Sequence, residues 1–100
     1  MKEIKKISQQ IDAELDDAEK YLKCAYKYKD TNSILANMYY DLSVAEMNHV
    51  TILHDASVKL ISEYKGQIPE GMQSLYEYLH ERHMKWARKI MTKQEQYKAV

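Results

Sequence analysis

The chain of 100 residues is long enough for one small domain, residues 1–100, with a modest core. Its 15 Lys+Arg balance its 15 Asp+Glu, which argues against nucleic acid or an anionic membrane as the main partner. The residues are 45% hydrophobic and 30% charged, which excludes disorder and a membrane span, and a single Cys24 excludes an internal disulfide framework. No charged segment followed by an apolar run resembles a signal peptide, so we expect a soluble, cytoplasmic protein.

Helix-breaking residues divide the chain into a few long segments. Three helices are predicted, over about residues 2–29, 32–65 and 70–96. The first break lies at Asp30–Ser33, whose side chains favour turns and N-caps because they compete for backbone hydrogen bonds. Gly66 is expected to end the second helix, and Pro69 to open the third. The β-branched alternation typical of strands is missing, so the fold class is all-α.

Each predicted helix carries an apolar stripe at heptad-like spacing. The stripes are Ile4, Ile7, Ile11, Ala18, Tyr21 and Ala25; then Leu35, Met38, Leu42, Ala45, Ile52 and Ala56; then Met72, Leu75, Leu79, Trp86 and Ile90. Three stripes joined by short connections predict a long antiparallel helical hairpin with a third helix beside it. The same stripes favour an oligomer over a monomer.

Polar residues interrupt two of these stripes. Glu14 takes a stripe position in the first helix, His49 takes one in the second, and Glu46 lies one turn before His49. A buried carboxylate needs a partner such as a cation or a metal. With the first turn centred near residue 30.5, Glu14 and Glu46 both lie about 24 Å from it, so antiparallel helices place all three residues at one level. Two carboxylates and an imidazole predict half of a transition-metal site.

At these residues the sequence resembles the ferritin-like di-iron carboxylate proteins. Their signature is a Glu on one helix and Glu-x-x-His on the next, repeated on a second helix pair. Here Glu14 precedes Glu46-Met47-Asn48-His49, and Tyr21 follows Glu14 by seven residues, as it tends to in the family. The resemblance covers residues from about 7 to 60. It implies metal ligation by Glu14, Glu46 and His49, with Tyr21 within reach to hydrogen-bond a ligand, and no catalytic residue beyond the ligands.

Only one helix pair of that bundle is present in the sequence. Glu77-Tyr78-Leu79-His80 repeats the motif, but with a second turn near residue 67.5 it lies about 18 Å from the level of Glu46. Glu77 and His80 are therefore expected at the surface. The resemblance then implies the half-length type, similar to encapsulated ferritin-like proteins, in which two chains form the four-helix bundle as a homodimer or part of a higher oligomer.

The resemblance also implies cofactors and partners. The expected metal is iron in a di-iron site, with Mn or Zn as alternatives, and the expected activity is Fe(II) oxidation by O₂ or peroxide, that of a ferroxidase. Self-association is the expected partnership, with no nucleic acid and no membrane. The tail, residues 92–100, has no clear version of the shell-docking peptide of encapsulated ferritins, so an encapsulin shell is not expected.

Several residues have alternative interpretations. Glu14 also fits an exposed carboxylate paired with Lys, and Asp17 replaces it as a ligand if the first turn is shifted. His83 lies on the third stripe near the level of His49, where a core histidine is the simpler interpretation and a ligand the other. His54 is expected at the surface. For the whole chain, the alternative is a non-catalytic helical assembly protein, phage or spore-coat-like; a site that holds Zn or Mn without turnover fits the same ligands.

Overall fold

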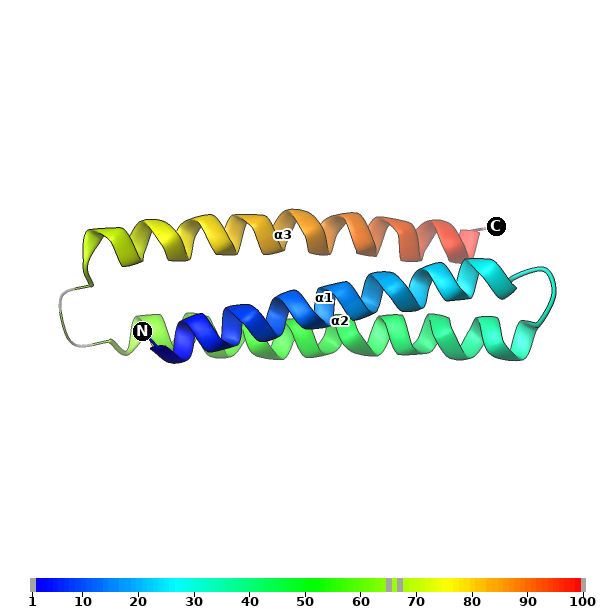
Figure 1. The fold of residues 1–100 in the computed structure, drawn as a ribbon, viewed down its shortest axis with the longest axis horizontal. Coiled ribbons are helices and arrows are strands. Elements are labelled where there is room, and N and C mark those ends of the chain that lie inside the picture. Colours follow the sequence, from blue (N-terminus) through cyan, green and yellow to red (C-terminus); the bar gives the residue numbers. More distant parts are fainter. Residues whose placement is uncertain (1, 65, 67, 100) are drawn as a thin grey trace.

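Three long helices form a rod, in which the all-α class and the number of helices are confirmed. The computed structural model describes residues 2–64, 66 and 68–99, and the regular structure within them is entirely helical. The helices are α1 (Lys2–Tyr28), α2 (Ser33–Ser62) and α3 (Glu70–Ala99). They run along a body of 55 × 17 × 16 Å, with the two turns at opposite ends (Figure 1). No helix among the described residues has an apolar stretch sufficient to cross a membrane.

The ends of α2 follow from local hydrogen bonds. At its start, the Asn32 side chain accepts a hydrogen bond from the backbone N–H of Leu35 at 3.1 Å, which is the N-cap that the first break favours. At its end, α2 stops earlier than expected, because Glu63 takes the C-cap and donates its N–H to the carbonyl of Lys59. Gly66 therefore lies beyond the helix and does not terminate it.

The seam between α1 and α2 consists largely of small side chains. Its buried residues are Ile4, Ser8, Ile11, Leu15, Ala18, Leu22 and Ala25 on α1 and Ala36, Ser43, Val50 and Ser57 on α2. Small side chains let two helices approach closely, and Ser43 Oγ donates to the Ala18 carbonyl at 2.7 Å. The hairpin register matches a turn centred near residue 30.5.

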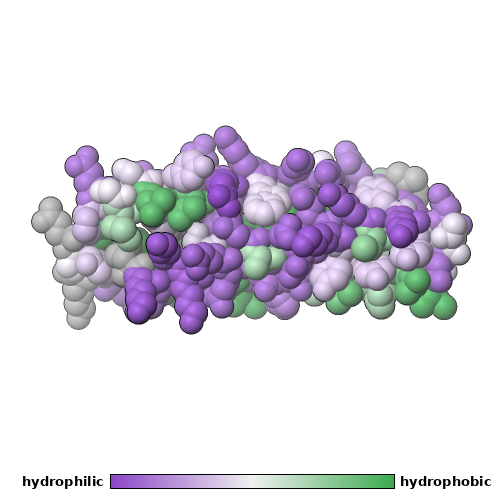
Figure 2. All heavy atoms as spheres, viewed as in Figure 1, coloured by the Kyte–Doolittle hydropathy of each residue, from purple (hydrophilic) through white to green (hydrophobic). Residues whose placement is uncertain are grey.

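The rotation of α1 and α2 differs from the predicted stripes. Leu15 and Val50, rather than Glu14 and His49, lie in the seam. Since one residue turns a helix by about 100°, Glu14 and His49 lie at the side of the seam instead of its centre. The predicted stripe of α2 is correspondingly exposed, with Ile52 66% accessible. Figure 2 shows a mostly hydrophilic surface with hydrophobic side chains along the lower edge, where α2 lies, and another group toward the upper left.

Helix α3 packs on the hairpin through a different set of residues. It begins after Pro69, whose carbonyl accepts from the N–H groups of Met72 and Gln73. Its buried residues are His83, Ala87, Ile90, Gln94 and Tyr97, so of the predicted stripe Ile90 is fully buried while Leu75 is exposed. Near the end of the helix, the Tyr97 ring lies against Tyr26 and Tyr40, and its carbonyl accepts from Lys29 Nζ at 2.7 Å.

Candidate metal centre

Two carboxylates and an imidazole meet at the side of the α1–α2 seam. Glu14 comes from α1, and Glu46 and His49 come from α2; one donor atom from each lies within 4.8 Å of the others. Nδ1 of His49 is 3.2 Å from Oε2 of Glu14 and 3.6 Å from Oε2 of Glu46. The three side chains that the register placed at one level are therefore brought together by the fold.

The local sequence explains why these side chains share one spot. Glu46 and His49 are three residues apart, so they lie on one side of α2 about one turn from each other. Leu15, next to Glu14, and Val50, next to His49, are buried in the seam and fix the rotation of each helix. The ligand positions therefore lie on two elements whose relative rotation the seam determines.

Burial decreases across the cluster from Glu46 to His49. The side chain of Glu46 is 16% exposed, that of Glu14 28% and that of His49 54%. Oε2 of Glu46 is buried and has no hydrogen-bond partner among the described residues. A buried carboxylate oxygen without a hydrogen bond is costly, and His49 Nδ1 at 3.6 Å is beyond hydrogen-bond distance, so this carboxylate favours a bound cation. Two carboxylates and one imidazole suit iron, manganese or zinc, so the donor set fits a metal ion.

The other residues proposed for the site lie outside this cluster. Asp17 is exposed on α1. Tyr21 stacks against Tyr39 of α2 at a ring separation of 6.2 Å, two turns from Glu14. His83 is directed toward α1, where its Nε2 donates to Oδ1 of Asp12 at 2.8 Å, and its side chain is only 4% exposed. His83 is therefore a buried core histidine, and its hydrogen bond is to Asp12 rather than to a residue of the carboxylate cluster.

Two histidines expected at the surface are instead partly buried. His54 of α2 and His80 of α3 lie 3.1 Å apart, Nε2 to Nδ1, in a hydrogen bond between the helices. With the second turn centred near residue 67.5, His54 is level with about residue 81. The register of α2 and α3 alone therefore indicates that His54 and His80 lie close together. Glu77 is exposed as expected and accepts from Gln73.

The cluster opens toward an exposed apolar face of α2. Met38, Leu42 and Ile52 belong to the same predicted stripe as His49, and all three are exposed. Ile7 and Tyr21 lie two turns on either side of Glu14 along α1, and both are half-buried. The candidate centre thus lies beside apolar side chains of α2 that are exposed in the single chain.

Comparisons with known proteins give no independent assignment: no protein-family model, curated protein or solved structure matches the chain.

Proposed function

We propose that the chain is a half-length ferritin-like protein in which two copies share a di-metal centre, with Fe(II) as the substrate that the centre oxidises. One observation carries the proposal: Glu14, Glu46 and His49 converge within 4.8 Å while Oε2 of Glu46 is buried without a hydrogen-bond partner. A cation bound there would offset the cost of burying that oxygen without a hydrogen bond. The resemblance described from the sequence supports the same three ligands.

Sharing between two copies follows from the number of ligands and from the exposed face. A di-metal carboxylate centre uses about six protein ligands, and one chain supplies three here. A two-fold axis beside α2 would bring Glu14, Glu46 and His49 of both chains together, as four carboxylates and two imidazoles. The same packing would cover Leu42 and Ile52, which are exposed on either side of His49. Burying these side chains supplies a driving force for the association.

The resemblance to the ferritin-like di-iron proteins implies a role for each ligand. Glu46, the least exposed of the three, would be the ligand shared between the metals, with Glu14 and His49 as the terminal ligands. When bound, iron supplies the electron transfer to O₂ or peroxide. The chain's own residues fix the ligands and limit water at the centre, since Leu15 and Val50 close the side toward the core. Carboxylates favour the more highly charged product ion, which supports oxidation over simple retention.

The test combines metal content, mass in solution and oxidation rate. Purified protein should hold about one iron per chain, have the mass of a dimer or a larger even-numbered assembly, and oxidise added Fe(II). Glu46→Gln and His49→Gln should each lower the rate by at least about tenfold, since each removes a direct ligand. Asp17→Asn and Asp41→Asn serve as matched controls, because both are exposed acids on the same two helices. A monomer, an absence of bound metal or unchanged rates in the ligand variants would contradict the proposal.

A structural assembly protein is the second candidate, favoured by the exposed apolar face of α2. In that case the buried carboxylate of Glu46 is only a cost, and Glu46→Leu should raise the stability whether or not metal is present. In a metalloprotein, the wild-type chain should instead gain stability on adding metal and the variant should lose that gain. If the protein held zinc or manganese and did not oxidise Fe(II), the metal site would be supported and the proposed reaction would be excluded.

A further inference from the structure

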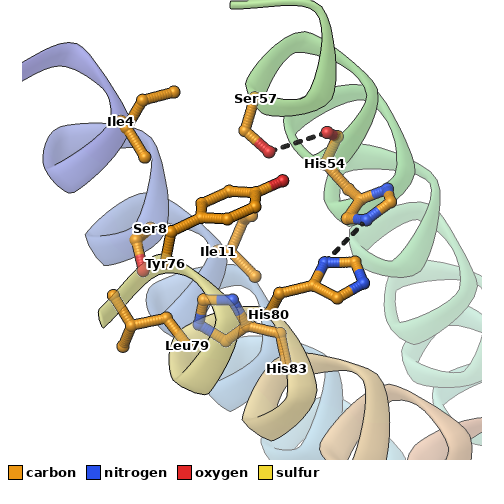
Figure 3. Close-up of a pocket in the computed structure, with 9 residues that line it drawn as sticks. All are labelled: Ile4, Ser8, Ile11, His54, Ser57, Tyr76, Leu79, His80 and His83. Atoms are coloured by element: carbon orange, nitrogen blue, oxygen red, sulfur yellow. Dashed lines mark hydrogen bonds between the residues drawn. The ribbon is translucent and has the colours of Figure 1, made fainter. Parts of the chain in front are cut away.

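A pair of imidazoles connects α2 to α3, away from the carboxylate cluster. Nε2 of His54 lies 3.1 Å from Nδ1 of His80, and the ring centres are 4.8 Å apart. Figure 3 shows the two rings approaching each other from the two helices, with Tyr76 between them and α1. His54 is five residues beyond His49, which is about 7.5 Å along α2 and on a different side of it. The pair therefore has its own surroundings.

The pair borders a cavity of about 20 Å³ between the three helices. Its wall combines apolar side chains, Ile4 and Ile11 of α1 and Leu79 of α3, with the imidazoles of His54, His80 and His83. A space of this size accepts a single water molecule or one small ion and excludes an organic ligand. What binds beside these imidazoles must therefore be of atomic size.

The two nitrogens already have the separation of two ligands on one metal ion. Zinc–nitrogen bonds of about 2.0–2.1 Å at tetrahedral or right angles place neighbouring ligand nitrogens about 2.9–3.4 Å apart. The observed 3.1 Å lies within that range. The hydrogen bond between the rings uses one lone pair and one N–H, so an ion would replace that proton after a modest rotation of the rings.

Charge and protonation at the pair also suit a metal. Oδ1 of Asp55 lies 3.7 Å from Nδ1 of His54, which is the side of the ring opposite the pair. A carboxylate in that position favours the proton on Nδ1 and leaves Nε2 as the ligand. With the His54 proton on Nδ1, the Nδ1 atom of His80 donates in the hydrogen bond, and it becomes a ligand when the imidazole proton of His80 moves to Nε2.

We propose that His54 and His80 form a second metal site, one that takes a divalent transition-metal ion preferring imidazole nitrogen, such as Zn²⁺, and clamps α2 to α3. Water would complete the coordination, since the His54 side chain is 25% exposed. The site differs in chemistry from the Glu14, Glu46 and His49 cluster, because nitrogen ligands favour zinc, copper or nickel over the harder ions that carboxylates accept. It does not depend on the proposed oxidation of iron.

The experiment isolates this pair by disabling the other cluster. In a Glu14→Gln, Glu46→Gln, His49→Gln background, untagged protein is titrated with Zn²⁺ by calorimetry and by the ring-proton NMR signals of His54 and His80. We expect one Zn²⁺ per chain, shifts confined to these two rings and their neighbours, and a Tm rise of about 6–11 °C at ten times the Kd, reversed by a chelator. In the same background, Asp55→Asn should weaken binding by about tenfold.

Two further variants decide between the pair and adventitious binding. Adding His54→Gln or His80→Gln to the background should abolish the one-to-one binding and the Tm rise, while Lys89→Gln, an exposed change on the same helix as His80, should preserve both. Each variant is checked for its helical circular dichroism before titration. Equal zinc binding with and without His54 and His80, or no saturable binding in the background protein, would overturn the proposal. Failure of iron oxidation in the wild-type chain would leave this result unaffected.

Discussion

The seam between α1 and α2 and the seam that α3 makes with them are closed by different kinds of side chain. Between α1 and α2, the fully buried positions include Ala18, Ala25 and Ser43, and the helices approach closely. In the α3 seam, the buried Ala87 and Ile90 are accompanied by polar pairs that reach across it: Asp12–His83, Glu19–Trp86 and Ser43–Gln94. A groove of about 250 Å³ also lies between α2 and α3.

This difference separates a part of the molecule that fixes geometry from a part that can adjust. The carboxylate cluster draws every ligand from α1 and α2, so its spacing depends on the tight seam alone. The histidine pair spans α2 and α3, where hydrogen bonds and open volume allow small movements. Changes in side-chain volume should therefore affect the first seam most, and changes in hydrogen bonding or pH should affect the second.

The largest expected effect comes from enlarging one small residue in each seam. Ala18→Leu should lower the free energy of unfolding by about 2–3 kcal/mol, because the α1–α2 seam has no room for the added carbons. Ala87→Leu should cost less than about 1 kcal/mol, because Ala87 lines the groove between α2 and α3. Urea denaturation of both variants measures the difference. Equal losses would show that the two seams are packed alike.

A smaller effect is expected where one hydroxyl joins all three helices. Ser43 Oγ donates to the Ala18 carbonyl and accepts from Gln94 Nε2, both in the core. Ser43→Ala leaves the Gln94 amide without its acceptor and should cost about 1–2 kcal/mol. Adding Gln94→Leu removes the unsatisfied amide, so the double variant should be more stable than Ser43→Ala. Strictly additive losses in this cycle would mean that the hydrogen bond contributes nothing to the α3 seam.

The smallest expected effect is a pH dependence of the α3 seam in chelator-treated protein. Burial and the neighbouring His54 and His83 lower the pKa of His80 from its ordinary value of 6.5. The unfolded chain then binds the proton more tightly, so the contribution of neutral His80 is complete above pH 6.5 and declines as the pH falls through the lowered pKa. Thermal unfolding between pH 7.5 and 5 should show this decline, and His80→Gln should make it shallower. Lys89→Gln should leave the slope as in the wild type.

The sequence was sufficient to predict the three helices and the position along the α1–α2 hairpin at which the carboxylate cluster lies. Asn32 and Pro69 mark the starts of α2 and α3, and the scarcity of glycine and proline elsewhere leaves long helices as the consistent choice. Glu14, Glu46 and His49 came together because their level depends only on the position of one turn and on the rise of a helix.

The predicted rotation of α2 about its own axis was wrong, because the helices packed against α2 determine which of its faces is buried. Leu42 and Ile52 have the larger apolar side chains and so indicated the core, yet α1 packs against Ala36, Ser43 and Ser57. Ser43 is acceptable there because a carbonyl of α1 and an amide of α3 satisfy its hydroxyl. A pattern within one helix does not contain those partners. The same limit explains why His54 and His80 were assigned to the surface.

Tyr97 anchors the end of α3 that lies farther from His80. Its ring is held by Tyr26 and Tyr40 and its carbonyl by Lys29, whereas Leu75 near the other end is exposed. His80 lies about 25 Å along the helix from that anchor, so a tilt of α3 by only about 5° about the anchored end would displace it by about 2 Å. That is enough to open a contact of 3.1 Å. The hydrogen bond of His83 to Asp12 of α1, only three residues from His80, therefore limits the tilt that would separate the histidine pair.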